Sequence, residues 1–211
     1  MGSVVSLNVV HATVPDVGGS VGITAIDKRP VSDRRAVTTD GVAGDKRCDM
    51  KHHGHPDQAV YAYAREDYAW WETELGMSLE SGTFGDNLTS YGIDWTSTPV
   101  GTVIQVGTAL LQVSTPRIPC GTFARWLGQD QWVKRFTQSG RSGSYLRVLE
   151  PGEIGIGDDM VIVEQPSHDV TILDLFEVYN GARDDEQLRR VAACVDTPED
   201  IREKAHKALA N

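Results

Sequence analysis

Short apolar segments separated by glycine and proline recur through residues 1–165, and this pattern limits the fold more than any other feature. Each segment is rich in β-branched or aliphatic residues and is bounded by turn formers such as Gly101, Gly107 and Pro151. Several short strands at this spacing are typical of a β-barrel or a β-sandwich. The segments that predict strands are 4–10, 102–106, 109–114, 145–149 and 160–164.

Two stretches in the same region have a helical pattern instead. Apolar residues recur at steps of three or four over 57–75, and Gly76 follows as a C-terminal cap, so we predict one long helix there. Similar spacing predicts a second helix over 122–136. Aromatic side chains on the two stretches are expected to pack the helices against the sheet. These side chains are Trp70, Trp71, Trp126 and Trp132.

The pattern changes after Pro166, where three short helices are predicted over 171–179, 184–195 and 197–209. Helices of this length are marginally stable alone in water, so they must pack on one another or on the rest of the chain. We therefore expect an α+β protein that is mainly β with helices. Its predicted domains are a strand-rich domain over 1–166 and a small three-helix domain over 167–211.

Charge and composition exclude several classes of protein. The net charge of −10 argues against a protein that binds nucleic acid or anionic membranes by charge alone. The apolar runs are far shorter than the roughly 18–20 residues that a membrane span needs, and the N-terminus lacks a secretory signal pattern. The cysteines Cys48, Cys120 and Cys194 are far apart and odd in number, so we expect reduced thiols and a cytoplasmic location.

The segment from Val113 to Gly121 carries the strongest signal for chemistry. Two prolines flank Arg117 and fix the backbone, so that its guanidinium and the thiol of Cys120 are held in a defined geometry. Cys120 precedes a predicted helix, and both a helix N-terminus and an arginine favour negative charge at the sulfur. Such a cysteine suits a nucleophile, a persulfide carrier or a ligand of a thiophilic metal, and the alternative is a buried, inert thiol.

Two further segments hold candidate binding residues. The stretch 41–57 gathers basic residues, glycines and histidines, which together are suited to bind phosphate. A solvated loop is the alternative, and zinc binding by Cys48 with its neighbouring histidines fits poorly, because the spacing matches no closed four-ligand set. The stretch 82–89 contains Asp86 and Asn87, which can cap a turn or face a polar heterocycle. Rossmann, P-loop and serine-hydrolase motifs are absent from the sequence.

Taken together and in this order, these segments resemble the MOSC domain family, named after the C-terminal part of molybdenum cofactor sulfurase. The resemblance covers essentially the whole chain and is greatest to the stand-alone bacterial branch, in which a MOSC-type β-barrel precedes a small three-helix domain. Its most specific element is Pro-Arg-x-Pro-Cys at 116–120. The other matching segments are Gly44-Asp45, His53-Gly54, residues 59–63 and residues 84–88.

The resemblance implies binding of the molybdenum cofactor (molybdopterin), with Cys120 as the metal ligand. It implies that Arg117 is a catalytic and cofactor-binding residue that neutralises an anion of the cofactor or substrate. Pyridoxal phosphate binding is a weaker association of the family. The implied cofactor contacts are Lys46, Arg47, His53, Asn87 and Arg117.

The resemblance also implies a reductase of N-hydroxylated small molecules, such as hydroxylaminopurines and amidoximes. Electrons would come from a separate flavin or iron–sulfur protein, since the chain has no flavin fingerprint and no iron–sulfur cysteine pattern. Two alternatives stay open: a carrier that holds a persulfide or the metal on Cys120, and a binding module whose C-terminal helices dock an electron-transfer partner. No nucleic-acid or membrane partner is expected, and the sequence leaves a homodimer open.

Overall fold

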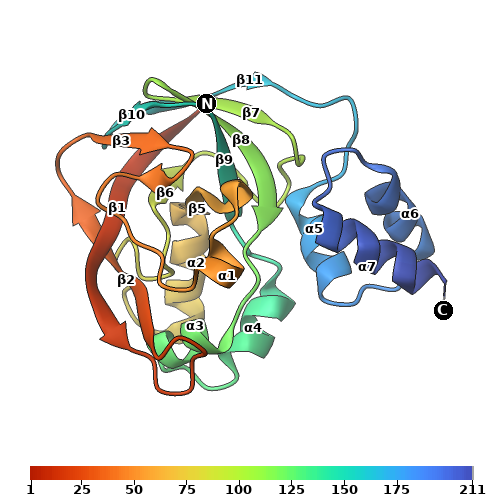
Figure 1. Cartoon of the computed structure of the whole chain (residues 1–211), viewed down its shortest axis with the longest axis horizontal. Helices are drawn as coiled ribbons and strands as arrows, with labels where there is room; N and C mark the ends of the chain where they lie inside the picture. The colour runs from red at the N-terminus through yellow and green to blue at the C-terminus, as the bar shows by residue number, and fades with distance from the viewer. Residues whose placement is uncertain (211) are drawn as a thin grey trace.

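The chain folds into a β-barrel with a group of helices packed against one side of it (Figure 1). The computed structural model describes residues 1–210, apart from the side chains of His52 and His53. The fold is therefore α+β, as the sequence predicts. In the described part of the chain, no helix is both long enough and apolar enough to cross a membrane.

The barrel closes because β1, the first strand of the chain, pairs with β11, the last strand of the chain. Gly2 lies opposite Met160 and Ser3 opposite Asp159, which joins the first barrel strand to the last. Only one neighbouring pair named here, β5 with β6, is parallel. Around the barrel the order is β11 (Asp159–Glu164), β7 (Val103–Val106), β8 (Ala109–Pro116), β9 (Ser144–Glu150), β5 (Val60–Ala64), β6 (Leu88–Tyr91) and β1 (Gly2–Pro15).

The remaining strands extend the barrel at its edges. The second half of β1 forms a hairpin with β2 (Ile23–Val31), which projects beyond the closed ring. A separate small sheet has the order β10 (Gly152–Ile154), β3 (Arg35–Thr38) and β4 (Gly41–Val42). All five predicted strands are present, as β1, β7, β8, β9 and β11, whereas β2 to β6 and β10 were not predicted.

The prediction of one helix over 57–75 is wrong in its first half. A 3₁₀ turn, η1 (Pro56–Gln58), and the strand β5 precede α2 (Arg65–Leu75), which ends at Gly76 as predicted. All five residues of β5 are buried, because it lies between β9 and β6 and is covered on both faces. A strand buried on both faces shows no alternation, so its apolar run also fits a helical period.

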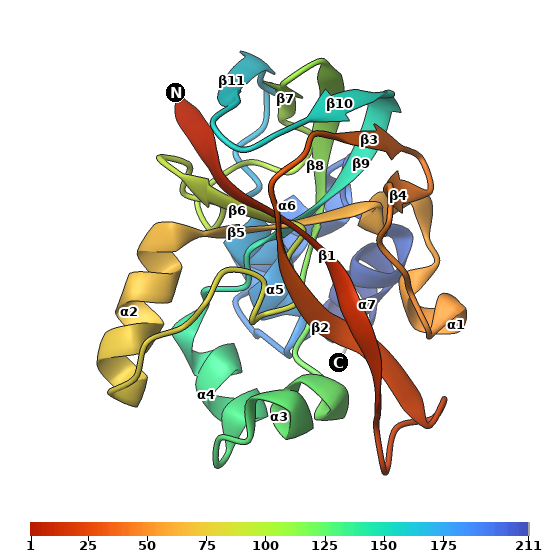
Figure 2. The ribbon, with the colours of Figure 1, turned by 90° about the vertical axis from the view of Figure 1, so that its left-hand side faces the viewer.

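The prediction of one helix over 122–136 is also wrong, because two helices occupy this stretch. They are α3 (Gly121–Leu127) and α4 (Trp132–Ser139), and Gly128 ends the first with a left-handed φ of 65°. A positive φ at glycine is a common way to stop a helix. Figure 2 shows α2, α3 and α4 gathered at one end of the barrel.

Aromatic rings fill the space between these three helices and the barrel. Phe84 lies at the centre, with ring centroids 4.9 Å from Tyr63, 4.8 Å from Tyr68 and 5.5 Å from Phe123. Trp71 and Trp132 are almost fully buried in the same cluster, and Trp70 and Trp126 pack against it. The expected packing role of the four tryptophans is confirmed.

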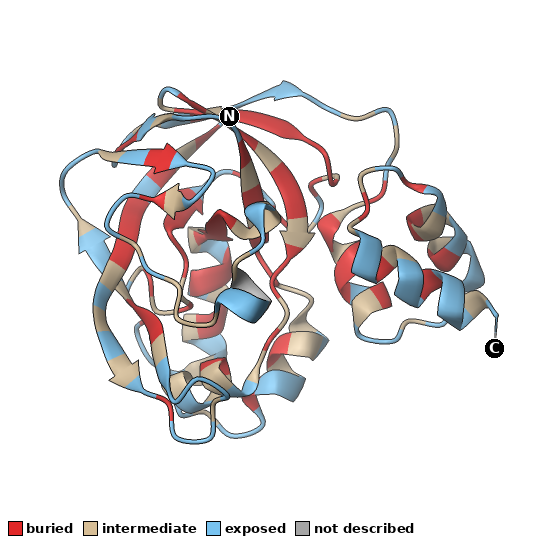
Figure 3. Ribbon diagram, viewed as in Figure 1, coloured by how far each residue is buried: buried red, intermediate tan, exposed pale blue. Residues whose placement is uncertain are grey.

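The three C-terminal helices lie close to their predicted positions. They are α5 (Ile172–Tyr179), α6 (Asp185–Ala193) and α7 (Glu199–Leu209). Asp184 is the N-cap residue of α6, and Pro198 is the N-cap residue of α7. The predicted domain boundary falls between the end of β11 and the start of α5. Buried residues continue from the barrel onto the inner faces of these helices (Figure 3), and the division into domains stays a prediction.

Backbone hydrogen bonds fix α5 to the barrel. Val100 N donates to Val170 O at 3.0 Å, and Ile172 N donates to Thr98 O at 3.1 Å. The side chain of Thr171 accepts from the Asp174 backbone N–H, and the Asp174 carboxylate accepts from the Thr171 backbone N–H, which forms a capping box. These bonds set the start of α5 against the loop between β6 and β7.

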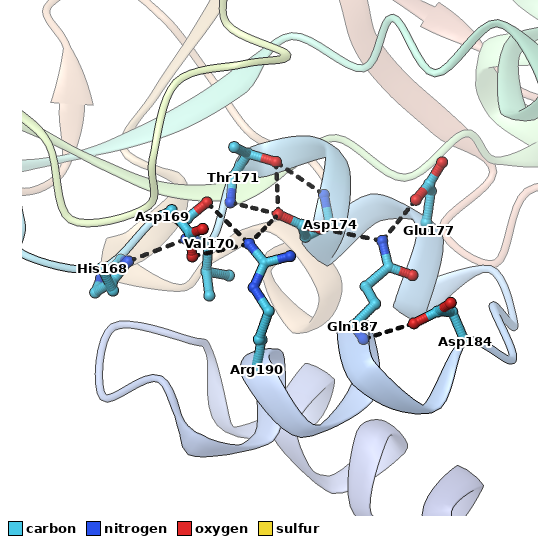
Figure 4. A network of polar contacts seen from close by, with 9 residues as sticks. All are labelled: His168, Asp169, Val170, Thr171, Asp174, Glu177, Asp184, Gln187 and Arg190. Carbon is cyan, nitrogen blue, oxygen red and sulfur yellow. Dashed lines mark hydrogen bonds and ion pairs between the residues drawn. The ribbon is translucent and has the colours of Figure 1, made fainter.

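A polar network joins α6 to α5 and to the residues that precede α5 (Figure 4). Arg190 Nη2 lies 2.9 Å from Asp169 Oδ1 and 3.6 Å from Asp174 Oδ2. Gln187 donates to Asp174 Oδ1 at 3.1 Å and to Glu177 Oε2 at 2.6 Å. Helices α5 and α6 are thus held together by polar contacts as well as by the apolar core that they share with the barrel.

Candidate functional site

Two clefts meet at Cys120, where the barrel, the hairpin of β1 and β2, and the C-terminal helices come together. The first cleft has a volume of about 870 Å³ with its open mouth and is lined by β2, the loop 45–49, Arg117 and Cys120. The second cleft has a volume of about 1440 Å³ with its mouth and lies between the loop 116–122 and helices α5 and α7. Cys120 therefore faces both spaces.

The local sequence explains how Cys120 reaches this position. β8 ends at Pro116, and the buried Pro116 and Pro119 carry the chain across to α3, for which Cys120 is the N-cap residue. Its backbone is extended (φ −133°, ψ 170°), and its side chain is half-buried. The predicted strand–proline–cysteine–helix arrangement is present, and the chemical role of the thiol stays a prediction.

Arg117 is a buried cation without an ionic partner among the described residues. It is 7% exposed, and its guanidinium carbon lies 3.8 Å from the ring centroid of Phe123 and 5.7 Å from that of Tyr61. Its Nη1 is buried without a hydrogen-bond partner. Burying a charged group is costly unless it is paired. Because Arg117 also lines the first cleft, its unpaired guanidinium provides a place for an anionic ligand.

Other predicted cofactor contacts lie around the same cleft. Lys46 is exposed at its wall, and Arg47 lines it while also donating to the backbone oxygen of Asp40. His53 belongs to the short helix α1 (Met50–His53), but its side chain lies outside the described part of the structure. The structure therefore brings Lys46 and Arg47 to the cleft that holds Arg117 and Cys120.

Asn87 also lines the first cleft, where its amide holds the wall together. Its Nδ2 donates to Asp45 Oδ2 at 2.8 Å and to Asn8 O at 3.3 Å, and its Oδ1 accepts from Tyr61 N at 3.1 Å. Asp45 is held in turn by Lys28 Nζ at 2.8 Å. A direct contact between Asn87 and a cofactor stays a prediction, because both ends of the amide are engaged in the protein.

Gln58 and Tyr145 are among the cleft residues that the sequence does not predict, and both line both clefts. Gln58 Oε1 is buried without a hydrogen-bond partner. Burial raises the pKa of the Tyr145 phenol although nearby Arg117 opposes this, so the hydroxyl stays protonated at neutral pH. Gln58 was hidden within the predicted long helix, and Tyr145 within a predicted strand.

A buried polar group, Asp86, lies in the sequence between two residues that line the first cleft, Gly85 and Asn87. Asp86 is fully buried and accepts hydrogen bonds from Tyr68 Oη and Thr89 Oγ1, both at 2.6 Å. Burial raises the pKa of Asp86, and the two hydroxyls oppose this shift. Asp86 does not line either cleft, so the alternative of a turn-stabilising role fits its position.

The hairpin tip is fastened beside Cys120 by a salt bridge. Asp16, the residue that follows β1, accepts from Arg125 Nε at 2.6 Å and from Thr122 Oγ1 at 2.6 Å. Both partners belong to α3, which begins directly after Cys120. The contact fixes the hairpin against the loop that presents the thiol.

The comparisons with known proteins agree with this architecture. A family model described as the MOSC domain matches residues 49–161. The chain is 33% identical over 170 residues to the uncharacterized protein YflK of Bacillus subtilis, covering 81% of this chain and 77% of YflK. It is 28% identical over 162 residues to a protein of Gibberella moniliformis named as a reductase, covering 75% of this chain but 28% of that protein.

A solved structure extends the likeness to the whole chain. The crystal structure of YiiM from Geobacillus stearothermophilus superposes with a TM-score of 0.81 at 30% identity, covering 99% of this chain and 100% of that one. The match therefore includes the C-terminal helices as well as the barrel. Because the family model covers more than half of the sequence and the fold agrees throughout, the chain belongs to the MOSC domain family.

Proposed function

We propose that the chain is a molybdenum-cofactor-dependent reductase of N-hydroxylated small molecules. The observation that carries the proposal is the buried, unpaired guanidinium of Arg117 in the same cleft as the half-buried thiol of Cys120. An anion-binding group beside a soft metal ligand matches a cofactor that carries both a phosphate and a thiophilic metal. Membership of the MOSC family and the likeness to a protein named as a reductase support the same class.

The side chains divide the work of holding the cofactor. Cys120 would ligate the metal through its sulfur, and Arg117 would pair with an anionic group in the first cleft. Lys46 and Arg47, on the loop at the cleft wall, would add positive charge for the phosphate. When bound, the cofactor supplies a metal that exchanges electrons and an oxygen atom with the substrate.

The proposed reaction breaks the N–O bond of the substrate. A group R–NHOH takes up two electrons and two protons, and R–NH₂ and water are released. The electrons come from a separate flavin or iron–sulfur protein. Tyr145 is placed to hold a proton at its Oη near Cys120, because burial keeps the phenol neutral and both residues line both clefts.

A carrier function is the second candidate, and the exposure of Cys120 to both clefts favours it. In this case the Cys120 thiolate would accept a sulfane sulfur from the persulfide of a cysteine desulfurase, whose own thiol would be released. Labelling of Cys120 as a persulfide, in a protein without reductase turnover, would distinguish the carrier from the reductase.

The test is anaerobic turnover by protein made in a host that synthesises the cofactor. We expect bound molybdenum by elemental analysis and reduction of 6-N-hydroxylaminopurine with a reduced viologen dye as donor. Cys120→Ala should lose turnover, whereas Cys194→Ser, at the C-cap of α6 and outside the lining of both clefts, should retain it. Turnover that survives Cys120→Ala, or no turnover with molybdenum confirmed in the wild type, would overturn the proposal.

A further inference from the structure

A histidine, a cysteine and an aspartate come together where the linker between β11 and α5 meets the turn between α6 and α7. His168 lies in the linker, and Cys194 and Asp196 lie in the turn. One ligand atom of each residue, a ring nitrogen, the thiol sulfur and a carboxylate oxygen, lies within 4.8 Å of the other two. None of the three residues lines either cleft, so this cluster is separate from the site proposed for the cofactor.

The cluster lies at the junction of the barrel and the C-terminal helices, largely shielded from solvent. Cys194 is 7% exposed, and the side chains of His168 and Asp196 are 22% and 33% exposed. Gly101, in the barrel loop before β7, lies against the Asp196 carboxylate, because a Cβ at Gly101 would be 2.7 Å from Asp196 Oδ2. The barrel backbone therefore forms one wall of the cluster, and the linker and the turn form the others.

The turn that carries Cys194 and Asp196 is held in place by hydrogen bonds. Thr197 N donates to Cys194 O at 3.3 Å. Arg202 Nη2, on α7, donates to Val195 O at 3.2 Å and to Thr197 O at 2.7 Å. Supporting contacts of this kind are what the ligands of a metal ion need. The Thr197 hydroxyl is itself buried without a hydrogen-bond partner among the described residues, and a buried hydroxyl of this kind is often satisfied by a bound water or ion.

The three side chains supply the ligand atoms that Zn²⁺ prefers, which are thiolate sulfur, imidazole nitrogen and carboxylate oxygen. Mg²⁺ and Ca²⁺ prefer oxygen ligands alone, so the thiol argues against them. In a tetrahedral zinc site, bonds of about 2.0–2.3 Å place the ligand atoms roughly 3.3–3.6 Å apart. His168 Nε2 and Asp196 Oδ2 are 2.9 Å apart, and all three ligand atoms lie within 4.8 Å, so small side-chain rotations would give this geometry.

We propose that His168, Cys194 and Asp196 form a zinc site that fastens the C-terminal helices to the barrel. A water molecule takes the fourth position, since the described residues of the cluster offer three ligands. The ion joins the linker to the turn between α6 and α7, beside the barrel backbone at Gly101. It therefore holds together three segments that are distant in sequence. This inference does not depend on the proposed function.

Zinc binding changes the protonation of two of the ligands. The Val170 backbone N–H donates to His168 Nδ1 at 3.3 Å (Figure 4), so the metal-free ring carries its proton on Nε2 and donates to Asp196 Oδ2. When Zn²⁺ binds Nε2, the ring proton moves to Nδ1 and the long hydrogen bond from Val170 is lost. The Cys194 thiol gives its proton to solvent. One proton is thus released for each ion bound, and Zn²⁺ binding weakens as the pH falls.

Titrations with Co²⁺ and Zn²⁺ test the site in the full chain, because a thiolate bound to Co²⁺ absorbs strongly in the near ultraviolet. In the double variant Cys48→Ser, Cys120→Ala, Cys194 is the one cysteine left, so the absorption band reports on this thiol alone. We expect one Co²⁺ per chain with this band, and its displacement by Zn²⁺. In this double variant, Cys194→Ala should abolish the band, and His168→Gln and Asp196→Asn should each weaken Zn²⁺ binding at least about a hundredfold.

The matched controls change side chains of the same types on α7. His206→Gln and Asp200→Asn, both at exposed positions, should bind Zn²⁺ as strongly as the double variant does. A second measurement uses the wild-type chain. Zn²⁺ should raise its midpoint of unfolding in urea above that of protein kept in a chelator, and His168→Gln and Asp196→Asn should each lose this rise.

The zinc site is overturned if the folded double variant gives no thiolate band with Co²⁺, or if folded His168→Gln and Asp196→Asn bind Zn²⁺ with undiminished affinity. If the double variant does not fold, the urea measurement decides, and equal midpoints with Zn²⁺ and with chelator in the wild type overturn the site. Because the three ligands line neither cleft, these outcomes leave the proposed reductase function unaffected. A failure of molybdenum-dependent turnover likewise leaves the zinc site unaffected.

Discussion

The guanidinium carbon of Arg117 lies 3.8 Å from the ring centroid of Phe123. Phe123 is itself fully buried in the aromatic cluster, so the cation is held over a ring that cannot move aside. The stacking orients the guanidinium but leaves its Nη1 without a partner. A group that is oriented by packing yet unsatisfied in its hydrogen bonds is prepared to bind a ligand.

Arg117→Lys is the first test of this arrangement. A lysine keeps the charge but loses the planar group that stacks on Phe123 and pairs with oxyanions through two N–H groups. The loss of about 1–2 kcal/mol of oriented interaction predicts roughly fivefold to thirtyfold weaker cofactor retention. Molybdenum per protein after dialysis measures this effect. Arg29→Lys, at a largely exposed position on β2, should retain the wild-type content, and equal retention in Arg117→Lys would contradict the assignment.

Acid should weaken the attachment of the hairpin to α3. Hydrogen bonds from Arg125 lower the pKa of Asp16, burial opposes this, and the Thr122 hydroxyl adds to the lowering. The native carboxylate therefore binds a proton more weakly than the unfolded one. Its contribution to stability is complete above the ordinary value of 3.8 and is lost as the pH falls through the lowered native value.

Asp16→Asn tests this dependence through the free energy of unfolding in urea, measured between neutral pH and acid. The variant should be less stable at pH 7 and should lose less of its remaining stability in acid than the wild type. Arg125→Met, which removes the partner of Asp16, should likewise make the free energy of unfolding depend less on pH in acid. If the free energy of unfolding falls equally with acid in the wild type and in both variants, the salt bridge is not the cause of the acid sensitivity.

The start of α5 depends on one hydroxyl. Thr171→Ala removes the acceptor for the Asp174 backbone N–H and should lower the free energy of unfolding by about 1 kcal/mol. Thr171→Ser keeps the capping box and should stay within a few tenths of the wild type. Urea denaturation of the three proteins at pH 7 measures the difference. Equal losses in the alanine and serine variants would mean that the methyl group, and not the cap, stabilises this end.

The predictions of secondary structure were right where sequence signals are local. Asp184 and Gly76 occupy the cap positions that their types favour, and the strands at 109–114 and 145–149 have apolar patterns of their own. The sequence of 60–64 fits a helical pattern, whereas its strand conformation depends on pairing with β6 and β9, which are distant in sequence. Local patterns do not contain that information.

The same limit applies to the site. Cys120 and Arg117 could be found because two prolines and a cysteine form a short motif. Gln58 and Tyr145 carry no motif, and only the fold brings them beside Cys120. The second cleft could not be predicted at all, since one of its walls comes from α5 and α7, more than fifty residues later in the chain than Cys120. The packing of the helices on the barrel creates it.

Asn87 provides a test of whether a cleft residue supports the wall or binds the ligand. In Asn87→Asp the two hydrogen bonds donated by Nδ2 are lost, and the new oxygen faces the Asp45 carboxylate and the Asn8 carbonyl. Buried groups left unsatisfied in this way predict a loss of about 2–4 kcal/mol in the free energy of unfolding. Asn180→Asp, at the exposed C-cap of α5, should lose less than about 1 kcal/mol.

Molybdenum content separates the two roles of Asn87. If the amide acts only within the wall, Asn87→Asp that is kept fully folded at low temperature should retain most of the wild-type molybdenum, although its unfolding midpoint in urea falls. A folded Asn87→Asp protein that retains no molybdenum would instead support the predicted contact with the cofactor. An unchanged unfolding midpoint would contradict the supporting role, because the two donated bonds would then contribute nothing measurable to stability.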